Sequence, residues 1–263
     1  MKLKFGVEIE FYGVHYQAVV DSLRQAGIAV ADYEGYTHAV IPKWKITTDV
    51  SVTSVGTGLP GRGLELVSPI LYGDEGLEEL EKVYTVLNSL DARVDKSCGT
   101  HVHFDVADYT VDNMKSFLNL FYRYQNVINY LVPKSRRNEN TYCQPITQSQ
   151  IDYINRPIND SIRDIANALM TRYKKINLQS YVKYGTLEVR QHGGTTEFEK
   201  IEAWIVLMYQ MIIKAKEQNF ECPSSLRRAT NVGIMELLKV TNLDDTYAGE
   251  YLMARYKHFK EVA

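Results

Sequence analysis

Residues 184–192 place the strongest constraint on the fold, because apolar and charged side chains alternate along this segment. Successive side chains of a β-strand point to opposite faces of the sheet, so the pattern predicts a strand with one apolar and one charged face. The charged face would carry Glu188, Arg190 and His192. An acid, an arginine and a histidine on one face could hold a metal ion and a phosphate side by side.

The same alternation recurs in three segments nearer the N-terminus, at residues 2–12, 63–69 and 99–106. Each segment predicts another half-buried strand, and residues 43–52 predict one more. If these strands share a sheet whose apolar faces pack on helices, their charged side chains gather on the opposite face. That face would include Glu8, Glu10, Glu65, His101 and His103, together with Glu188 and Arg190.

Helical periodicity between the predicted strands indicates an α+β fold, with helices layered on an antiparallel sheet. Residues 176–181 and 186–192 are expected to form two strands that are joined near Gly185. Residues 133–159 are polar, and a connection of this length is typical of a lid, a binding loop or a disordered segment. We expect one catalytic domain over residues 1–263. Its helices are expected at about residues 15–27, 74–90, 110–131, 161–171 and 195–218, with a helical extension over 222–263.

The formal charge of −2 argues against broad binding to a nucleic-acid backbone, which needs a basic surface. We therefore expect no nucleic-acid partner, except a modified nucleotide as a substrate. Three cysteines without a close pair suit a reducing compartment better than a disulfide framework. The longest apolar stretch, residues 203–213, is shorter than the roughly 20 residues that span a bilayer. Because Glu8 also interrupts any secretory signal, these features predict a cytoplasmic protein without a membrane partner.

Several carboxylates on one concave face repel one another and raise each other's pKa values. A divalent cation relieves that repulsion. Carboxylate oxygens are suitable ligands for Mg²⁺ or Mn²⁺, and imidazole is an acceptable ligand for Mn²⁺. Metals held beside an arginine such as Arg190 suit phosphoryl transfer, because both neutralise charge on the transferred group.

Each of these residue pairs also has a purely structural interpretation. The spacing of Glu8 and Glu10 is that of the solvent-exposed face of an edge strand. Two histidines two residues apart on a strand occur without any ligand, and Glu188 with Arg190 could form a plain cross-strand salt bridge. The functional interpretation depends on all of these residues sharing one face.

Five short motifs, taken in order, resemble those of a known family. They are GVEIE at residues 6–10, DVS at 49–51, LELVSP at 64–69, CGTHVH at 98–103 and GTLEVR at 185–190. This pattern is similar to the amidoligase family of carboxylate–amine ligases, which has the fold of glutamine synthetase and glutamate–cysteine ligase. Many proteins with these motifs come from bacteria and phages. The resemblance covers most of the chain, from residue 6 to about residue 210.

The resemblance implies a fold and a reaction. The fold would be a curved antiparallel sheet, with one charged catalytic face that holds two or three Mg²⁺ or Mn²⁺ ions and with helices packed on the other face. ATP would phosphorylate a carboxylate to an acyl phosphate, and an amine would then displace the phosphate to form an amide. The metal ligands carried over motif by motif are Glu8, Glu10, Glu65, His101 and Glu188.

The remaining site residues are also assigned by the resemblance. Arg190 would stabilise the transferring γ-phosphoryl group, and Glu65 would lie near the carboxylate substrate. Asp49 and Ser51 would lie near the amine or carboxylate, with Asp49 a candidate base for the attacking ammonium. His103 would contact the nucleotide phosphates, although His101 and His103 could exchange roles.

Two residues match a segment that precedes the last motif of the family, which has the pattern R-[YF]-x-x-x-N. Arg172 and Asn177 would contact nucleotide or substrate there. A hydrogen bond at the strand edge is the structural alternative for Asn177. We expect substrate specificity to reside in residues 33–63 and 133–160, while the carboxylate, the amine and the oligomeric state stay open.

Three other functions fit the same sheet. A phosphotransferase acting on a guanidino group would carry a reactive cysteine and several phosphate-binding arginines, which the sequence does not show in a matching pattern. A metal-dependent hydrolase would turn over without nucleotide. A non-catalytic binding protein would use the charged face as a ligand groove and would show no metal-dependent nucleotide binding.

Overall fold

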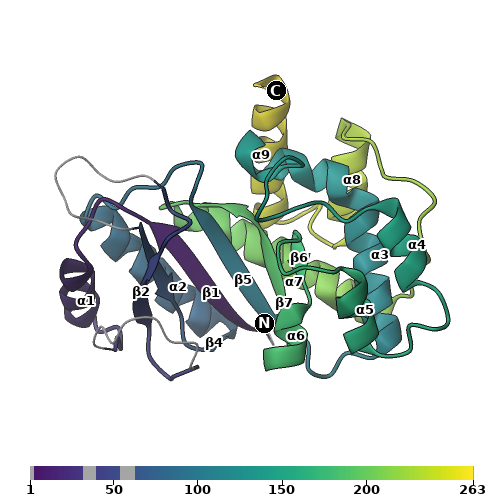
Figure 1. Cartoon of the computed structure of the whole chain (residues 1–263). Coiled ribbons are helices and arrows are strands. Elements are labelled where there is room, and N and C mark those ends of the chain that lie inside the picture. The colour runs from purple at the N-terminus through teal and green to yellow at the C-terminus, as the bar shows by residue number, and fades with distance from the viewer. Residues whose placement is uncertain (1–2, 32–39, 54–62, 263) are drawn as a thin grey trace. The chain divides into compact units, whose positions relative to one another are not determined.

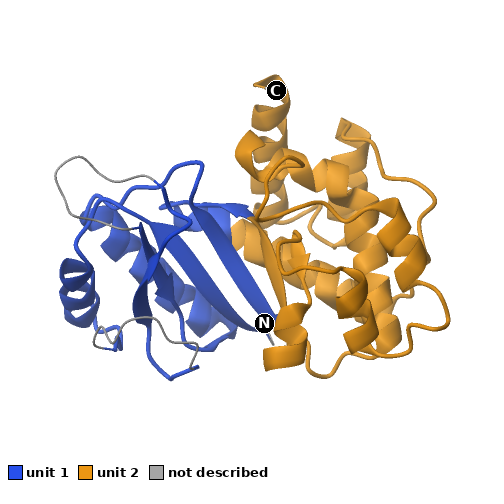
Figure 2. Cartoon of the chain, in the orientation of Figure 1, with its two compact units in different colours: residues 1–104, 192–201 blue, residues 105–191, 202–263 orange. Residues whose placement is uncertain are grey.

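The computed structural model of the chain describes residues 3–31, 40–53 and 63–262 (Figure 1). Two compact units make up the chain, one of residues 1–104 and 192–201 and one of residues 105–191 and 202–263 (Figure 2). We call them unit 1 and unit 2. The parts of the predicted specificity loop at residues 33–39 and 54–62 lie outside the described residues.

Unit 1 contains an antiparallel sheet with the strand order β2-β3-β1-β5, and β4 pairs with the start of β1 (Figure 1). The pairing confirms the predicted α+β class with an antiparallel sheet. All the predicted strands of this unit are present, although each is shorter than predicted. The strands are β1 (Lys4–Phe11), β2 (Lys45–Asp49), β3 (Gly63–Val67), β4 (Leu71–Tyr72) and β5 (Gly99–Asp105).

The apolar sides of these strands form the core of unit 1 with helices α1 (Tyr16–Gln25) and α2 (Gly73–Ser89). Every second residue of β1 from Phe5 to Phe11 is buried, as the alternation predicts. Helix α2 begins with Asp74 and Glu75 in its first turn, where acidic side chains favour the helix dipole. The indole of Trp44, just before β2, is buried and donates a hydrogen bond to Glu79 Oε1 of α2 at 2.7 Å.

Unit 2 is mainly helical. Helix α3 (Val111–Ile128) is the longest helix that lies wholly within this unit. It begins at a capping box in which the side chains of Thr110 and Asn113 each accept a hydrogen bond from the other's backbone N–H. Two helices, α8 and α9, form the tail predicted beyond residue 222. The other elements are η1 (Asn129–Leu131), η2 (Lys134–Arg136), α4 (Gln148–Ile154), α5 (Ile162–Ala168), β6 (Ile176–Asn177), α6 (Gln179–Tyr184), β7 (Thr186–Gly193), α7 (Phe198–Glu217), α8 (Asn231–Val240) and α9 (Tyr247–Glu261).

The strand predicted over residues 176–181 is wrong for most of its length, because it ends at Asn177 and gives way to helix α6. The side chain of Asn177 accepts a hydrogen bond from Gln179 N at 2.8 Å, which turns the chain out of the strand. Ser180 Oγ then bonds the carbonyls of Asn177 and Thr186. Gly185 ends the helix with a φ of 71°, a conformation that glycine adopts without steric cost.

Residues 133–159 are folded against the rest of unit 2, so the disordered alternative for this segment is wrong. Cys143, Ile146 and Ile151 are buried. The buried side chain of Gln125 on α3 satisfies both backbone groups of Ile146, with bonds of 3.1 and 2.9 Å. These contacts are long-range in sequence, which is why the local pattern gave no sign of them. Among the described residues, every helix is too short or too polar to cross a membrane.

Candidate functional site

The charged face of unit 1 is centred on Glu8, whose two carboxylate oxygens each face a histidine of the neighbouring strand. Strand pairing sets Glu8 of β1 opposite His101 of β5. Glu8 Oε2 lies 3.0 Å from His101 Nδ1, and Glu8 Oε1 lies 3.3 Å from His103 Nε2. Burial alone would raise the pKa of Glu8, but the hydrogen bonds to both imidazoles hold it well below its usual value. The carboxylate is therefore ionised and available as a ligand.

Glu10 occupies the next position on the same face and is almost fully buried. Strand pairing sets it opposite Glu65 of β3. Its Oε2 accepts a hydrogen bond of 2.6 Å from Gly99 N, and its Oε1 lies 3.7 Å from His101 Nε2. The imidazole of His101 therefore lies between the carboxylates of Glu8 and Glu10. Sequence alternation predicted that these side chains share a face, and strand pairing brings them into contact.

Asp49 lies at the end of β2, and strand pairing sets Thr47, two residues before it, opposite Glu65. The carboxylate of Asp49 accepts hydrogen bonds of 2.6 Å from both the backbone N–H and the hydroxyl of Ser51. This local turn fixes the direction of the Asp49 side chain. The predicted positions of Asp49 and Ser51 near the amine or carboxylate, and the role of Asp49 as a base, stay predictions.

Two sets of three side chains on this face could each hold a metal ion, and Glu65 belongs to both. One set is Glu8, Glu65 and His101, and the other is Glu10, Asp49 and Glu65. In each set the candidate ligand atoms lie within 4.8 Å of one another. Opposite ligands of Mg²⁺ lie about 4.2 Å apart, given metal–oxygen distances of about 2.1 Å. The sets therefore fit Mg²⁺ or Mn²⁺ after a small contraction, and their oxygen and imidazole donors suit both ions.

Lys45 on β2 is a member of this face that the sequence interpretation missed. Burial lowers the pKa of Lys45, while the nearby carboxylates of Glu8 and Glu65 raise it. Its ammonium group therefore offsets part of the negative charge that Glu65 contributes to both sets. The signal was present in the sequence, since Lys45 lies between Trp44 and Ile46 and shares its side of the strand with Asp49.

The predicted site residues of unit 2 are organised around the carboxylate of Glu188 on β7. Strand pairing sets Asn177 of β6 opposite Glu188, and Asn177 Nδ2 donates a hydrogen bond of 2.5 Å to Glu188 Oε2. Glu188 Oε1 forms an ion pair with Arg190 Nη1. Arg190 Nε also donates to the carbonyl of Tyr142 at 3.3 Å. Asn177 thus makes the strand-edge hydrogen bond of the structural interpretation, and contacts of Asn177 and Arg190 with nucleotide stay predictions.

The positions of Arg172 and Cys98 are also clear. Arg172 is exposed; its guanidinium stacks 5.1 Å from the centre of the Tyr173 ring and donates a hydrogen bond of 3.2 Å to the Tyr173 hydroxyl. Its predicted contact with nucleotide or substrate stays a prediction. Cys98 is buried, and burial raises the pKa of its thiol to about 12. A nucleophilic role for Cys98 is therefore disfavoured.

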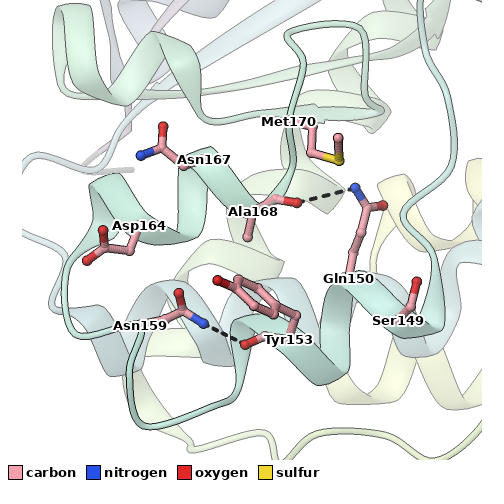
Figure 3. A pocket seen from close by; sticks show the side chains of 8 residues that line it. All are labelled: Ser149, Gln150, Tyr153, Asn159, Asp164, Asn167, Ala168 and Met170. Atoms are coloured by element: carbon pink, nitrogen blue, oxygen red, sulfur yellow. Dashed lines mark hydrogen bonds between the residues drawn. The ribbon is translucent and has the colours of Figure 1, made fainter.

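A groove of about 570 Å³ lies between α4 and α5 in unit 2 (Figure 3). The phenol of Tyr153 points into it, and the side chain of Asn159 donates a hydrogen bond of 2.5 Å to the carbonyl of Tyr153. None of the predicted site residues lines this groove. Its lining residues are Ser149, Gln150, Tyr153, Asn159, Asp164, Asn167, Ala168 and Met170.

A family model described as "Putative amidoligase enzyme" matches residues 1–212. The chain belongs to the amidoligase family. The match covers every motif on which the resemblance rests, and it leaves out helices α8 and α9. No curated protein matches the chain. A solved structure described as a "novel glutamine synthase homolog" is similar at 12% sequence identity and a TM-score of 0.46, over 99% of this chain. The amidoligase chain spans 66% of the length of that structure.

Proposed function

We propose that this member of the amidoligase family is an ATP-dependent carboxylate–amine ligase that requires Mg²⁺ or Mn²⁺. The observation that carries the proposal is the pair of ligand sets that share Glu65 on the charged face of unit 1. Adjacent cation sites suit a reaction on nucleotide phosphates, whose negative charge must be neutralised before an oxygen can attack.

The proposed reaction has two balanced steps. A carboxylate oxygen of the substrate attacks the γ-phosphorus of ATP, the bond to the bridging oxygen breaks, and ADP leaves. The nitrogen of the amine then attacks the acyl carbon, phosphate leaves with the electron pair of the carbon–oxygen bond, and the nitrogen loses a proton. The substrates are a small-molecule or peptide carboxylate and an amine.

The residues of the chain have separate roles in this proposal. Bound Mg²⁺ or Mn²⁺ would neutralise phosphate charge and polarise the phosphoryl oxygens. Its ligands in unit 1 would be Glu8, Glu10, Asp49, Glu65 and His101, while His103, which lies 3.3 Å from Glu8, would contact the nucleotide phosphates.

Two residues of unit 2 complete the assignment, on the strength of the family motifs. Glu188 is proposed as a further metal ligand, and Arg190 is proposed to stabilise charge on the transferring phosphoryl group. Glu188 also holds the guanidinium of Arg190 through their ion pair.

Thermal unfolding tests the proposal without knowledge of the substrates. We expect Mg²⁺ and ATP together to raise the melting temperature more than either does alone, since the nucleotide binds as its metal complex. Glu8→Gln, which keeps the size of the side chain but removes its charge, should lose this effect. Glu78→Gln, on the exposed side of α2, is the matched control and should keep it.

Trapping with hydroxylamine then tests the acyl phosphate. A mixture of amino acids and dicarboxylates, supplied with Mg²⁺, ATP and hydroxylamine, should give a hydroxamate and ADP in equal amounts. Turnover of a substrate without nucleotide would instead indicate a metal-dependent hydrolase. Phosphate transfer to a guanidino compound would indicate a phosphotransferase. The absence of any metal-dependent nucleotide binding would refute the proposed function and favour a binding protein.

A further inference from the structure

Both backbone groups of Arg190 are held by residues outside its own strand. Its N–H donates a hydrogen bond of 2.8 Å to the carbonyl of Lys175. Its carbonyl accepts a hydrogen bond of 2.6 Å from Nη2 of Arg136. The second bond is unusual, because a side chain takes a position that a backbone N–H normally fills in a sheet.

The ladder between β6 and β7 explains why this carbonyl is open. The strands pair Ile176 with Val189, so the next pair along the ladder is Lys175 with Arg190. In a regular antiparallel pair the two residues would exchange both of their hydrogen bonds. Lys175 N–H instead donates to the carbonyl of Gln144 at 2.9 Å. The carbonyl of Arg190 is left for the guanidinium of Arg136.

Arg136 itself is 2% exposed, and no described carboxylate lies within ion-pair distance of it. Among the described residues, its guanidinium donates one hydrogen bond, which goes to Arg190, and its Nε donates none. Burying a cation without an acidic partner is costly. An apolar side chain would fill this buried position at a lower cost. We therefore attribute the presence of an arginine to the hydrogen bond that its guanidinium donates to the Arg190 carbonyl.

The segment that carries Arg136 also holds the side chain of Arg190. Its turn is closed by Asn140, which bonds the carbonyl of Ser135 and the N–H of Cys143 at 2.7 and 3.1 Å. The carbonyl of Tyr142, in the same turn, accepts from Arg190 Nε at 3.3 Å. One folded segment thus fixes both the backbone and the guanidinium of Arg190.

We propose that Arg136 is a positioning residue for Arg190. The inference rests on the proposed function for the catalytic role of Arg190, but the contact itself does not. Without the Arg136 bond, the backbone of Arg190 loses one of the two hydrogen bonds that hold it on this side of β7. The guanidinium of Arg190 then samples directions other than the one set by Glu188 and the carbonyl of Tyr142.

The first test is spectroscopic and needs no substrate. In protein labelled with ¹⁵N-arginine, the Nε–H signal of Arg190 is identified by its loss in Arg190→Lys. We expect this signal to exchange slowly with water in the wild type and faster, with a changed shift, in Arg136→Met. Arg137→Met is the matched control, because Arg137 is the next residue but stacks on Tyr130 at 4.5 Å. It should leave the Arg190 signal unchanged.

A conservative variant keeps the test decisive if Arg136→Met fails to fold. Arg136→Lys retains one donor for the carbonyl and should restore part of the slow exchange. An unchanged Arg190 signal in a folded Arg136→Met or Arg136→Lys protein would overturn the proposal.

The second test uses turnover with the carboxylate identified by hydroxylamine trapping. Arg136→Met should lower kcat by about 10-fold to 100-fold, because small displacements of a catalytic group are costly. The dissociation constant for Mg·ATP should change by less than about twofold, a split that general destabilisation would not produce. Equal kcat in wild type and variant overturns the positioning role alone. A wild type without ATP turnover, with the Arg190 signal still altered by Arg136→Met, refutes the proposed function but not the contact.

Discussion

The carboxylate of Glu65 gives the sharpest test of the charged face, because it belongs to both ligand sets. It lies within 4.8 Å of ligand atoms of Glu10 and Asp49, so each like-charge pair costs about 1 kcal/mol in water and about 3.5 kcal/mol at an effective dielectric constant of 20. Glu65 and Asp49 are only half-buried, which brings the cost toward the lower value, and Lys45 offsets part of it. Without metal, Glu65→Gln should therefore leave stability unchanged or raise it by about 1 kcal/mol.

Metal reverses the sign of this effect. At 100 times its dissociation constant, Mn²⁺ adds about 2.7 kcal/mol to the wild type, or roughly 5–10 °C in melting temperature for a chain of this size. If the loss of one ligand weakens binding about 100-fold, the same Mn²⁺ concentration adds only about 0.4 kcal/mol to Glu65→Gln. The variant should thus be the more stable protein without metal and the less stable protein with it.

The assay is thermal unfolding with and without Mn²⁺, at a concentration set by titration of the wild type. Glu78→Gln removes the same charge from an exposed position of α2 and should behave as the wild type does. Glu8→Gln and Asp49→Asn each remove a ligand from one set and should lose less of the shift than Glu65→Gln does. A full Mn²⁺ shift in Glu65→Gln would refute the shared-ligand interpretation.

Two further predictions concern stability. Burial lowers the pKa of Lys175 to about 7 from its ordinary value near 10.5, so between these pH values the unfolded chain binds more protons and the folded state gains stability as the pH rises; urea unfolding at pH 7 and 9.5 should show a gain that is smaller in Lys175→Met. Gly194→Ala would place a methyl group 2.5 Å from Cys98 Cβ and should cost about 1–3 kcal/mol in the same assay, whereas Gly6→Ala, whose new methyl group would lie 3.6 Å from Ser68 Oγ, should be nearly neutral.

The faces of the strands were predictable from the sequence because they follow from a two-residue period. Alternation placed Glu8 and Glu10 on one side of β1 and both histidines on one side of β5. It did not predict that Glu8 lies opposite His101 and Glu10 opposite Glu65. Register depends on pairing between segments more than 50 residues apart, which a local pattern does not encode.

The hydrogen bond between Arg136 and Arg190 was not predictable from the sequence for a related reason. Arg136 lies in a segment without periodicity, and its guanidinium contacts a carbonyl 54 residues away in the sequence. The sequence shows an arginine in a polar loop, which is typical of a solvent-exposed side chain. The end of β6 was predicted too late, because a local pattern suggested a strand where the chain forms a helix. The β-forming pattern of residues 176–181 is overridden by local side-chain hydrogen bonds: Asn177 Oδ1 accepts from Gln179 N, and Ser180 Oγ donates to the carbonyl of Asn177.

The clustered and buried charges of the two units are not what selection for stability alone would produce. The sheet of unit 1 keeps carboxylates at positions 8, 10, 49 and 65, where neutral amides of the same size would avoid mutual repulsion. Unit 2 buries four cationic side chains among the described residues, Arg136, Lys174, Lys175 and Lys214, but Glu188 is its one buried carboxylate there. Both arrangements cost stability in the isolated chain. A bound cation would offset the cost in unit 1, and this is why the response of Glu65→Gln to Mn²⁺ separates a functional face from a solvated one.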